Sequence, residues 1–202
     1  MRAWLELTAV LAAMVLHFVL TRVVGIRGLD IVPISVCVAV YAVVRGRSRE
    51  VRAEWGTRRA GFGACLRGTV PLLLLGTAVC LLIGLYRGFV AVDLHLLVTV
   101  LLYPLWGVAQ QFLVLSLFAR NLDALGVPRA AVLGVAALGF ACVHAPNWPQ
   151  VAATLVLGAW CAHLFFAHRN LWPLGLAHGV LGALFYRWVL GTDVVDALFT
   201  HR

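Results

Sequence analysis

Charged residues are scarce in this chain. Only 12% of its 202 residues are charged, whereas 63% are hydrophobic. A soluble domain usually has about a quarter charged residues and about half apolar ones. The core of so small a protein cannot hide this excess, so lipid must solvate much of it. The composition excludes an ordinary soluble domain and predicts an all-α, polytopic transmembrane helical bundle.

Lysine is absent, and all sixteen basic residues are arginine. The arginines flank apolar segments and do not form a patch interleaved with aromatic side chains. This distribution argues against nucleic acid as a partner and favours signals of membrane topology. The sequence also shows no loop typical of an ATP site or of another soluble cofactor, which leaves membrane lipid as the expected partner.

Paired cysteines are also missing. The five cysteines are odd in number, none forms a CxxC pair, and four of them fall in apolar segments: Cys37, Cys65, Cys80, Cys142 and Cys161. We therefore expect small side chains that pack between helices, and neither a disulfide framework nor a cysteine metal site.

Hydropathy divides the chain into about seven spans. They cover residues 4–24, 31–44, 69–86, 94–118, 130–144, 150–167 and 174–190. The first is long and lacks a clear cleavage site, so we expect a retained helix and not a signal peptide. We divide the chain into a two-helix region with a basic loop, residues 1–67, and a transmembrane core, residues 68–202.

The arginines predict the orientation. Seven of them crowd the segment 45–67, which the positive-inside rule places in the cytoplasm together with the N-terminus. We expect an integral protein of a bacterial inner membrane. The arginines left on the other side are Arg22, Arg27, Arg87, Arg187 and Arg202. The basic segment could also rest on anionic lipid as an interfacial helix, although a solvated topology signal is favoured.

A few polar residues interrupt the apolar C-terminal half. They are Gln110, Gln111, His144, Asn147 and His178. A polar side chain at membrane depth is costly and needs a partner, so it marks a candidate functional site. Pro146 and Pro149 must break the helix beside His144 and Asn147. Irregular backbone at this depth requires surrounding protein or a water-filled cavity, which keeps these side chains away from lipid.

The segment around His178 is rich in glycine. Gly175, Gly179 and Gly182 give one helix a face of small residues, which allows a neighbouring helix to approach closely. An unpartnered ring nitrogen of His178 would be costly in such packing. Each polar position alone has an ordinary structural explanation, but three of them on three helices favour a common site.

The order and spacing of these residues resemble the CPBP family, the Abi or CAAX-protease-like intramembrane proteases. Phe140 and His144 match the family's Phe-x-x-x-His motif, and His178 matches the histidine of a later motif within NLWPLGLAHG. Gln110 and Gln111 align with the paired glutamates of a first motif. The resemblance covers roughly residues 95–190 and implies an endopeptidase that acts on a membrane-anchored or lipidated substrate.

The sequence departs from the family at the first motif. Glutamines replace both glutamates, Leu115 stands at the position of the motif's arginine, and Arg120 follows slightly later. At the third motif, Gly182 replaces an asparagine. A glutamine amide cannot accept a proton as a general base and is a poor ligand for a transition metal. The single acidic residue between positions 94 and 192 is Asp123, which lies in a predicted loop.

These residues support two chemistries. In the first, His144 or His178 acts as the base, while amides of Gln110, Gln111 and Asn147 donate hydrogen bonds to an oxyanion. In the second, His144 and His178 hold a divalent metal such as zinc. Two ligands fall short of the usual three. His163 and His168 could supplement them, although packing and capping roles are favoured, and His17 and His95 receive no role.

Two functions of different classes remain open. One is an intramembrane hydrolase with an altered, Gln- and His-based site. The alternative is a non-catalytic member of the family that acts as a membrane binding or chaperone-like protein. A small transporter is a weaker third interpretation, because the sequence shows neither inverted repeats nor carboxylates for a coupling ion.

Overall fold

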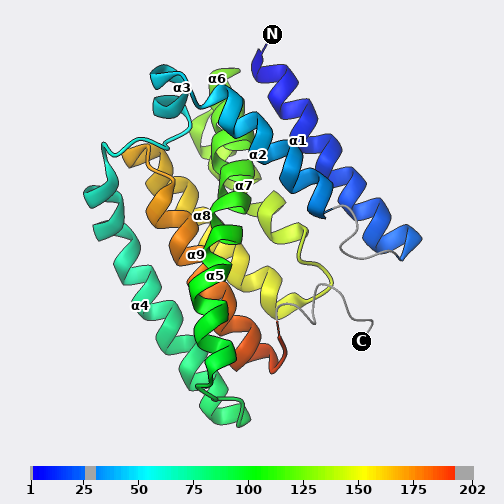
Figure 1. Ribbon diagram of the computed structural model, residues 1–202, viewed down its shortest axis with the longest axis vertical. Coiled ribbons are helices and arrows are strands. Elements are labelled where there is room, and N and C mark those ends of the chain that lie inside the picture. Colours follow the sequence, from blue (N-terminus) through cyan, green and yellow to red (C-terminus); the bar gives the residue numbers. More distant parts are fainter. Residues whose placement is uncertain (1, 26–30, 194–202) are drawn as a thin grey trace.

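The computed structural model describes residues 2–25 and 31–193, and these residues form helices joined by turns (Figure 1). The all-α prediction is confirmed for this part of the chain. Labels with η denote π-helical segments. The elements are α1 (Arg2–Phe18), η1 (Val19–Val24), α2 (Ile31–Arg45), α3 (Arg49–Glu54), α4 (Phe62–Arg87), α5 (Leu94–Gln111), η2 (Phe112–Ala119), α6 (Arg120–Ala124), α7 (Arg129–Cys142), α8 (Trp148–His168), α9 (Trp172–Leu184) and η3 (Phe185–Leu190).

Three helices among the described residues are long and apolar enough to cross a membrane. They cover Phe62–Arg87, Leu94–Ala124 and Trp148–His168. Two further apolar helices, Val32–Arg45 and Arg129–Cys142, are shorter. The protein is therefore an integral membrane protein. The count of seven spans is not confirmed, because these shorter helices fall below the ~20 residues that a straight crossing needs.

Local signals explain where α5 and α8 begin. Asp93 Oδ1 accepts a hydrogen bond from the backbone N–H of Leu96 at 2.8 Å, which lowers the pKa of Asp93 and caps α5. At α8, Asn147 Oδ1 accepts from the N–H of Gln150 at 3.3 Å, and Pro149 occupies the first turn. The predicted break at the prolines is confirmed, since α7 ends at Cys142 and α8 begins at Trp148.

Helices α5 and α9 form the most extensive contact between two elements of the fold. Glycines bring their backbones together. A methyl group placed on Gly179 would lie 2.2 Å from the Cα of Pro104, and one on Gly175 would lie 2.5 Å from the Cα of Val108. The small-residue face predicted for this helix is thus confirmed, and it sets the register between α5 and α9.

The other helices surround this pair. In Figure 1, α4 runs along one side of α5 and α9, while α1 and α2 lie on the opposite side. Helix α4 packs against α8, α9 and η3, and α7 packs against α8. The side chains of Trp55, Phe112 and Phe165 belong to the main apolar core, which joins α3 to the bundle.

Several sequence predictions are left open by the fold. Arg27 and Arg202, two of the arginines expected on the far side of the membrane, lie outside the described residues. The cytoplasmic N-terminus and the division at residues 67 and 68 stay predictions.

We expect Gly179→Ala to destabilise the protein by about 1–3 kcal/mol, because its new methyl group would overlap backbone atoms of Pro104. Gly139→Ala is a matched control within α7, where a methyl group meets nothing within 4 Å. The control should be neutral or stabilising by roughly 0.5–1 kcal/mol. Unfolding in mixed micelles measures both variants, and equal stabilities would contradict the close packing of α5 on α9.

Candidate functional site

Gln111 and His178 meet between α5 and α9. Gln111 is fully buried and His178 is 4% exposed. Gln111 Nε2 lies 3.4 Å from His178 Nδ1, within hydrogen-bond distance. Gln111 Oε1 has no hydrogen-bond partner among the described residues. A buried acceptor without a partner is costly, so this oxygen is available to a polar ligand or water.

The ring of His178 is held from two sides. The backbone of Gly107, one turn before Gln111 on α5, also acts on this ring. With Gln111 Nε2 donating to Nδ1, the proton of the neutral imidazole sits on Nε2. Both partners belong to α5 and are placed by the glycine contact with α9. The surroundings of His178 favour an oriented, neutral ring.

His144 lies in the turn after α7 and joins the same cluster through Phe140. The Phe140 ring packs edge-on against His144 at 5.2 Å and against His178 at 5.1 Å between ring centroids. His144 Nδ1 donates to the carbonyl of Phe140 at 2.8 Å. The second nitrogen, Nε2, therefore carries the lone pair of the neutral ring and can accept a proton.

The remaining predicted residues are less closely tied to the histidines. Gln110 and Asn147 are partly exposed, and none of the hydrogen bonds described for the chain joins either of them to His144 or His178. Asn147 uses Oδ1 to cap α8, so its Nδ2 group is the available donor. The structure adds His17 of α1, which the sequence left without a role. It lies close enough to His144 for a charge on one ring to act on the other.

A buried polar stripe leads away from the site along the π-helix. Gln111, Ser116 and Asn121 recur at intervals of five residues and are all fully buried. Gln111 ends α5, Ser116 lies in η2 and Asn121 lies in α6, so the three polar side chains follow one continuous helix. Ser116 Oγ donates to the carbonyl of Trp55 at 2.7 Å.

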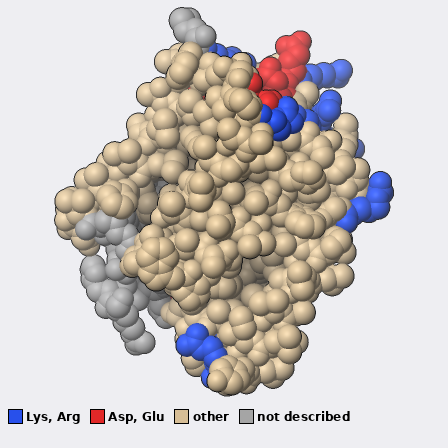
Figure 2. Space-filling model, turned by 180° about the vertical axis from the view of Figure 1, so that it is seen from behind, with Lys and Arg blue, Asp and Glu red and all other residues tan. Residues whose placement is uncertain are grey.

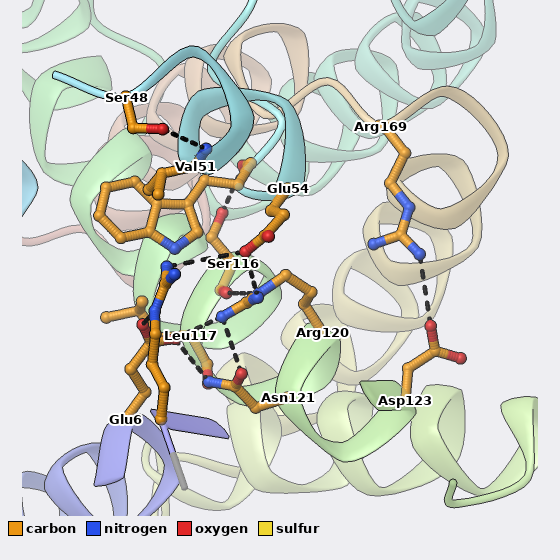
Figure 3. A network of polar contacts seen from close by, with 12 residues as sticks. Glu6, Ser48, Val51, Glu54, Ser116, Leu117, Arg120, Asn121, Asp123 and Arg169 are labelled. Carbon is orange, nitrogen blue, oxygen red and sulfur yellow. Dashed lines mark hydrogen bonds and ion pairs between the residues drawn. The ribbon is translucent and has the colours of Figure 1, made fainter. Parts of the chain in front are cut away.

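The stripe ends at a second polar cluster, drawn in Figure 3, which is centred on Glu6 of α1. The Glu6 side chain is only 4% exposed and accepts hydrogen bonds from Arg2, Tyr41, Arg120 and Asn121. Arg2 Nε lies 2.9 Å from it and Asn121 Nδ2 lies 2.8 Å from it. This cluster ties α1 to α2 and to the end of the α5–η2–α6 helix.

Arg120 has a structural role in this second cluster. It also pairs with Glu54 Oε2 at 2.8 Å and donates through Nε to the carbonyl of Ser116 at 2.9 Å. Since Arg120 follows Gln111 by nine residues of helix, roughly 10 Å or more separates the two backbones. The Glu6 carboxylate is therefore committed to Arg120 and does not replace the glutamates that the first motif lacks.

The residues around His144 and His178 do not fit a metal ion. Among residues 2–25 and 31–193, no three His, Cys, Asp or Glu side chains gather closely enough to hold one. His163, offered as an additional ligand, is exposed on α8. The donors near the two imidazoles are the amide of Gln111 and backbone carbonyls, which transition metals bind poorly. We therefore assign no metal chemistry to this site.

A comparison with known protein families identifies this part of the fold. The family model described as "Type II CAAX prenyl endopeptidase Rce1-like" matches residues 93–184, just under half of the chain. This region is similar to the CAAX-protease family. The match confirms the resemblance seen in the motifs. Neither a curated protein nor a solved structure matches the chain.

The CAAX-protease-like region extends from the cap of α5 to the end of α9 and contains Gln111, Phe140, His144 and His178. Helices α1 to α4 lie outside it, including Glu6 and His17. At the position of the family's arginine, Leu115 is fully buried in the apolar core. The arginine that follows belongs to the second polar cluster.

We expect Glu6→Ala to lower the free energy of unfolding by about 3 kcal/mol, since it leaves Arg120 and Asn121 without their buried acceptor. Glu50→Ala removes an exposed carboxylate of α3 and serves as the control, with an expected change within about 0.5 kcal/mol. The measurement is unfolding of each purified variant in mixed micelles. Equal effects of the two substitutions would contradict the anchoring role of Glu6.

Proposed function

We propose that the protein is a CAAX-protease-like intramembrane hydrolase that cleaves a membrane-anchored or lipidated peptide. The proposal is carried by one observation: within the family-matching region, His144 donates through Nδ1 to the Phe140 carbonyl, which leaves the lone pair on Nε2, and the Phe140 ring joins it to the buried pair of Gln111 and His178. The substrate class follows from the name of the matching family, which describes a prenyl endopeptidase, and from the membrane-spanning helices.

His144 acts as the general base in this proposal. Its Nε2 takes a proton from water as the water oxygen attacks the carbonyl carbon of the scissile peptide bond. The same proton then passes to the departing amine when the C–N bond breaks. The hydrogen bond from Nδ1 to the Phe140 carbonyl fixes the tautomer and the direction of the ring.

The amides supply polar contacts that need no charge. Gln111 Oε1 is a buried acceptor without a partner, which suits the O–H of the attacking water or an N–H of the peptide. The side-chain N–H groups of Gln110 and Asn147 are the donors proposed for the oxyanion. Gln111 also positions His178, and in this proposal the His178 ring orients its neighbours and takes no proton.

The non-catalytic alternative rests on the replaced carboxylates. Where the first motif of the family has glutamates, this chain has Gln110 and Gln111, and the buried Glu6 is held by Arg120. A site with acceptors and donors but no carboxylate can bind a peptide without cleaving it. The two functions differ in whether new peptide termini form.

We expect His144→Ala to reduce cleavage by about 10²–10⁴-fold, the usual contribution of a general base. The assay compares protein termini in membranes of cells that express the wild type, His144→Ala or no protein, by mass spectrometry. His163→Ala is the control, because His163 is an exposed histidine of α8. New peptide termini that form with the wild type and with His163→Ala, but not with His144→Ala, support the hydrolase.

Full activity of His144→Ala would overturn the role of this histidine. If the wild type forms no new termini, the double substitution Gln110→Glu and Gln111→Glu tests the alternative. Termini that form only with this double variant would show that the native site binds without cleaving.

A further inference from the structure

The loop before α4 is held against the turn between α8 and α9 by hydrogen bonds and close packing. Asn170 is fully buried, and its Nδ2 donates to the carbonyls of Arg58 at 2.7 Å and Ala60 at 3.0 Å. Gly61 packs against the end of α8. A methyl group added to Gly61 would lie 2.2 Å from the carbonyl oxygen of His168. The loop backbone is therefore fixed against the turn between α8 and α9. The side chains of Arg58 and Arg59 are exposed on the surface.

These arginines lack a neutralising partner. Arg58, Arg59 and the nearby Arg67 of α4 are exposed, and none of the ion pairs described for the chain includes them. The sequence contains no Asp or Glu at residues 55–92, nor at residues 124–192, which covers all of α4, α8, α9 and η3. The nearest preceding carboxylate, Glu54, pairs with Arg120. Three exposed positive charges thus flank the start of α4, and none of the described ion pairs neutralises them.

Two tryptophans place this surface at the level of lipid headgroups. Trp172 Nε1 donates to the carbonyl of Thr57 at 3.1 Å, and Trp160 Nε1 donates to the carbonyl of Gly68 at 3.0 Å. Their side chains remain 41% and 42% exposed. Tryptophans with a satisfied N–H and an exposed ring gather at the interface between membrane and water.

An apolar surface continues from the arginines along α4. Leu66, Val70 and Leu74 are exposed at 41%, 38% and 66%, at the spacing that places them on one side of the helix. Figure 2, which shows one face of the molecule, has its charged side chains mostly at one end and a broad uncharged region beyond them. Positive charge next to a lipid-exposed apolar helix is complementary to a phospholipid with a net negative headgroup.

We propose that Arg58, Arg59 and Arg67 form a binding surface for an anionic phospholipid. The guanidinium groups contact the phosphate and headgroup, while the acyl chains lie along the exposed side of α4. Arginine suits this role because its planar group keeps its charge and donates several hydrogen bonds to phosphate oxygens. The contact is separate from the His144 site and does not depend on the proposed hydrolysis.

The test compares two double variants that each lose two exposed arginines. Arg58→Gln with Arg59→Gln changes the proposed surface, and Arg47→Gln with Arg49→Gln changes the turn before α3 and the first residue of α3. Each purified protein is held in neutral detergent with equal amounts of phosphatidylglycerol and phosphatidylcholine. Native mass spectrometry then counts the lipids of each kind that stay bound.

We expect the wild type to retain phosphatidylglycerol in preference to phosphatidylcholine. The Arg58/Arg59 variant should lose this preference by roughly fivefold per arginine, while the Arg47/Arg49 variant changes by less than about twofold. No preference in the wild type, an unchanged preference in the Arg58/Arg59 variant, or equal losses in both variants would overturn the proposal. Equal losses would mean a diffuse attraction to the basic end of the molecule.

A single substitution provides a second test in case a double variant fails to fold. Arg67→Gln alters only an exposed side chain within α4 and should reduce the preference by roughly fivefold. Circular dichroism and gel filtration verify the fold of every variant. An unchanged preference in folded Arg67→Gln would remove Arg67 from the surface and overturn the proposal as stated.

Discussion

The contact between the backbones of α5 and α9 is the constraint on which the rest of the site depends. Gly175 and Gly179 have no side chain that would separate the two helices, so Pro104 and Val108 touch α9 directly. At this separation the short reach of a glutamine is sufficient for Gln111 to meet His178. Helix packing in a membrane lacks the hydrophobic drive that acts in water, and contacts of this kind supply the needed van der Waals energy.

The fold separates the buried carboxylate of Glu6 from the cluster of His144 and His178. The buried carboxylate of Glu6 lies at one end of the α5–η2–α6 helix, where Arg120 compensates its charge. The histidine cluster lies beside Gln111 and is surrounded by neutral groups. Keeping a carboxylate out of this apolar region avoids a large desolvation cost. It also means that any proton transfer there has to rely on imidazole.

The sequence predicted those features that depend on a local signal with one dominant structural effect. Glycine spacing predicted the face of α9, prolines predicted the break before α8, and ordered motifs predicted the family. The partnership of Glu6 with Arg120 joins positions 114 residues apart and has no local signal. The approach of His17 to His144 likewise depends on how α1 is anchored. Helix length was underestimated at several spans, since Phe62–Arg87 and Leu94–Ala124 extend beyond the predicted residues 69–86 and 94–118, because hydropathy does not follow a helix into its more polar ends.

The π-helix η2 links the two polar clusters through its register. Gln111 contacts His178 at one end, and Asn121 donates to Glu6 at the other. Each residue adds a rotation about the helix axis, about 100° in an α-helix and less in a π-helix. Removal of one residue from 112–119 would rotate one end relative to the other, so that only one of the two partnerships could form. The length of this segment, more than the identity of its apolar side chains, thus fixes how the N-terminal helix and the histidine cluster share a single bundle.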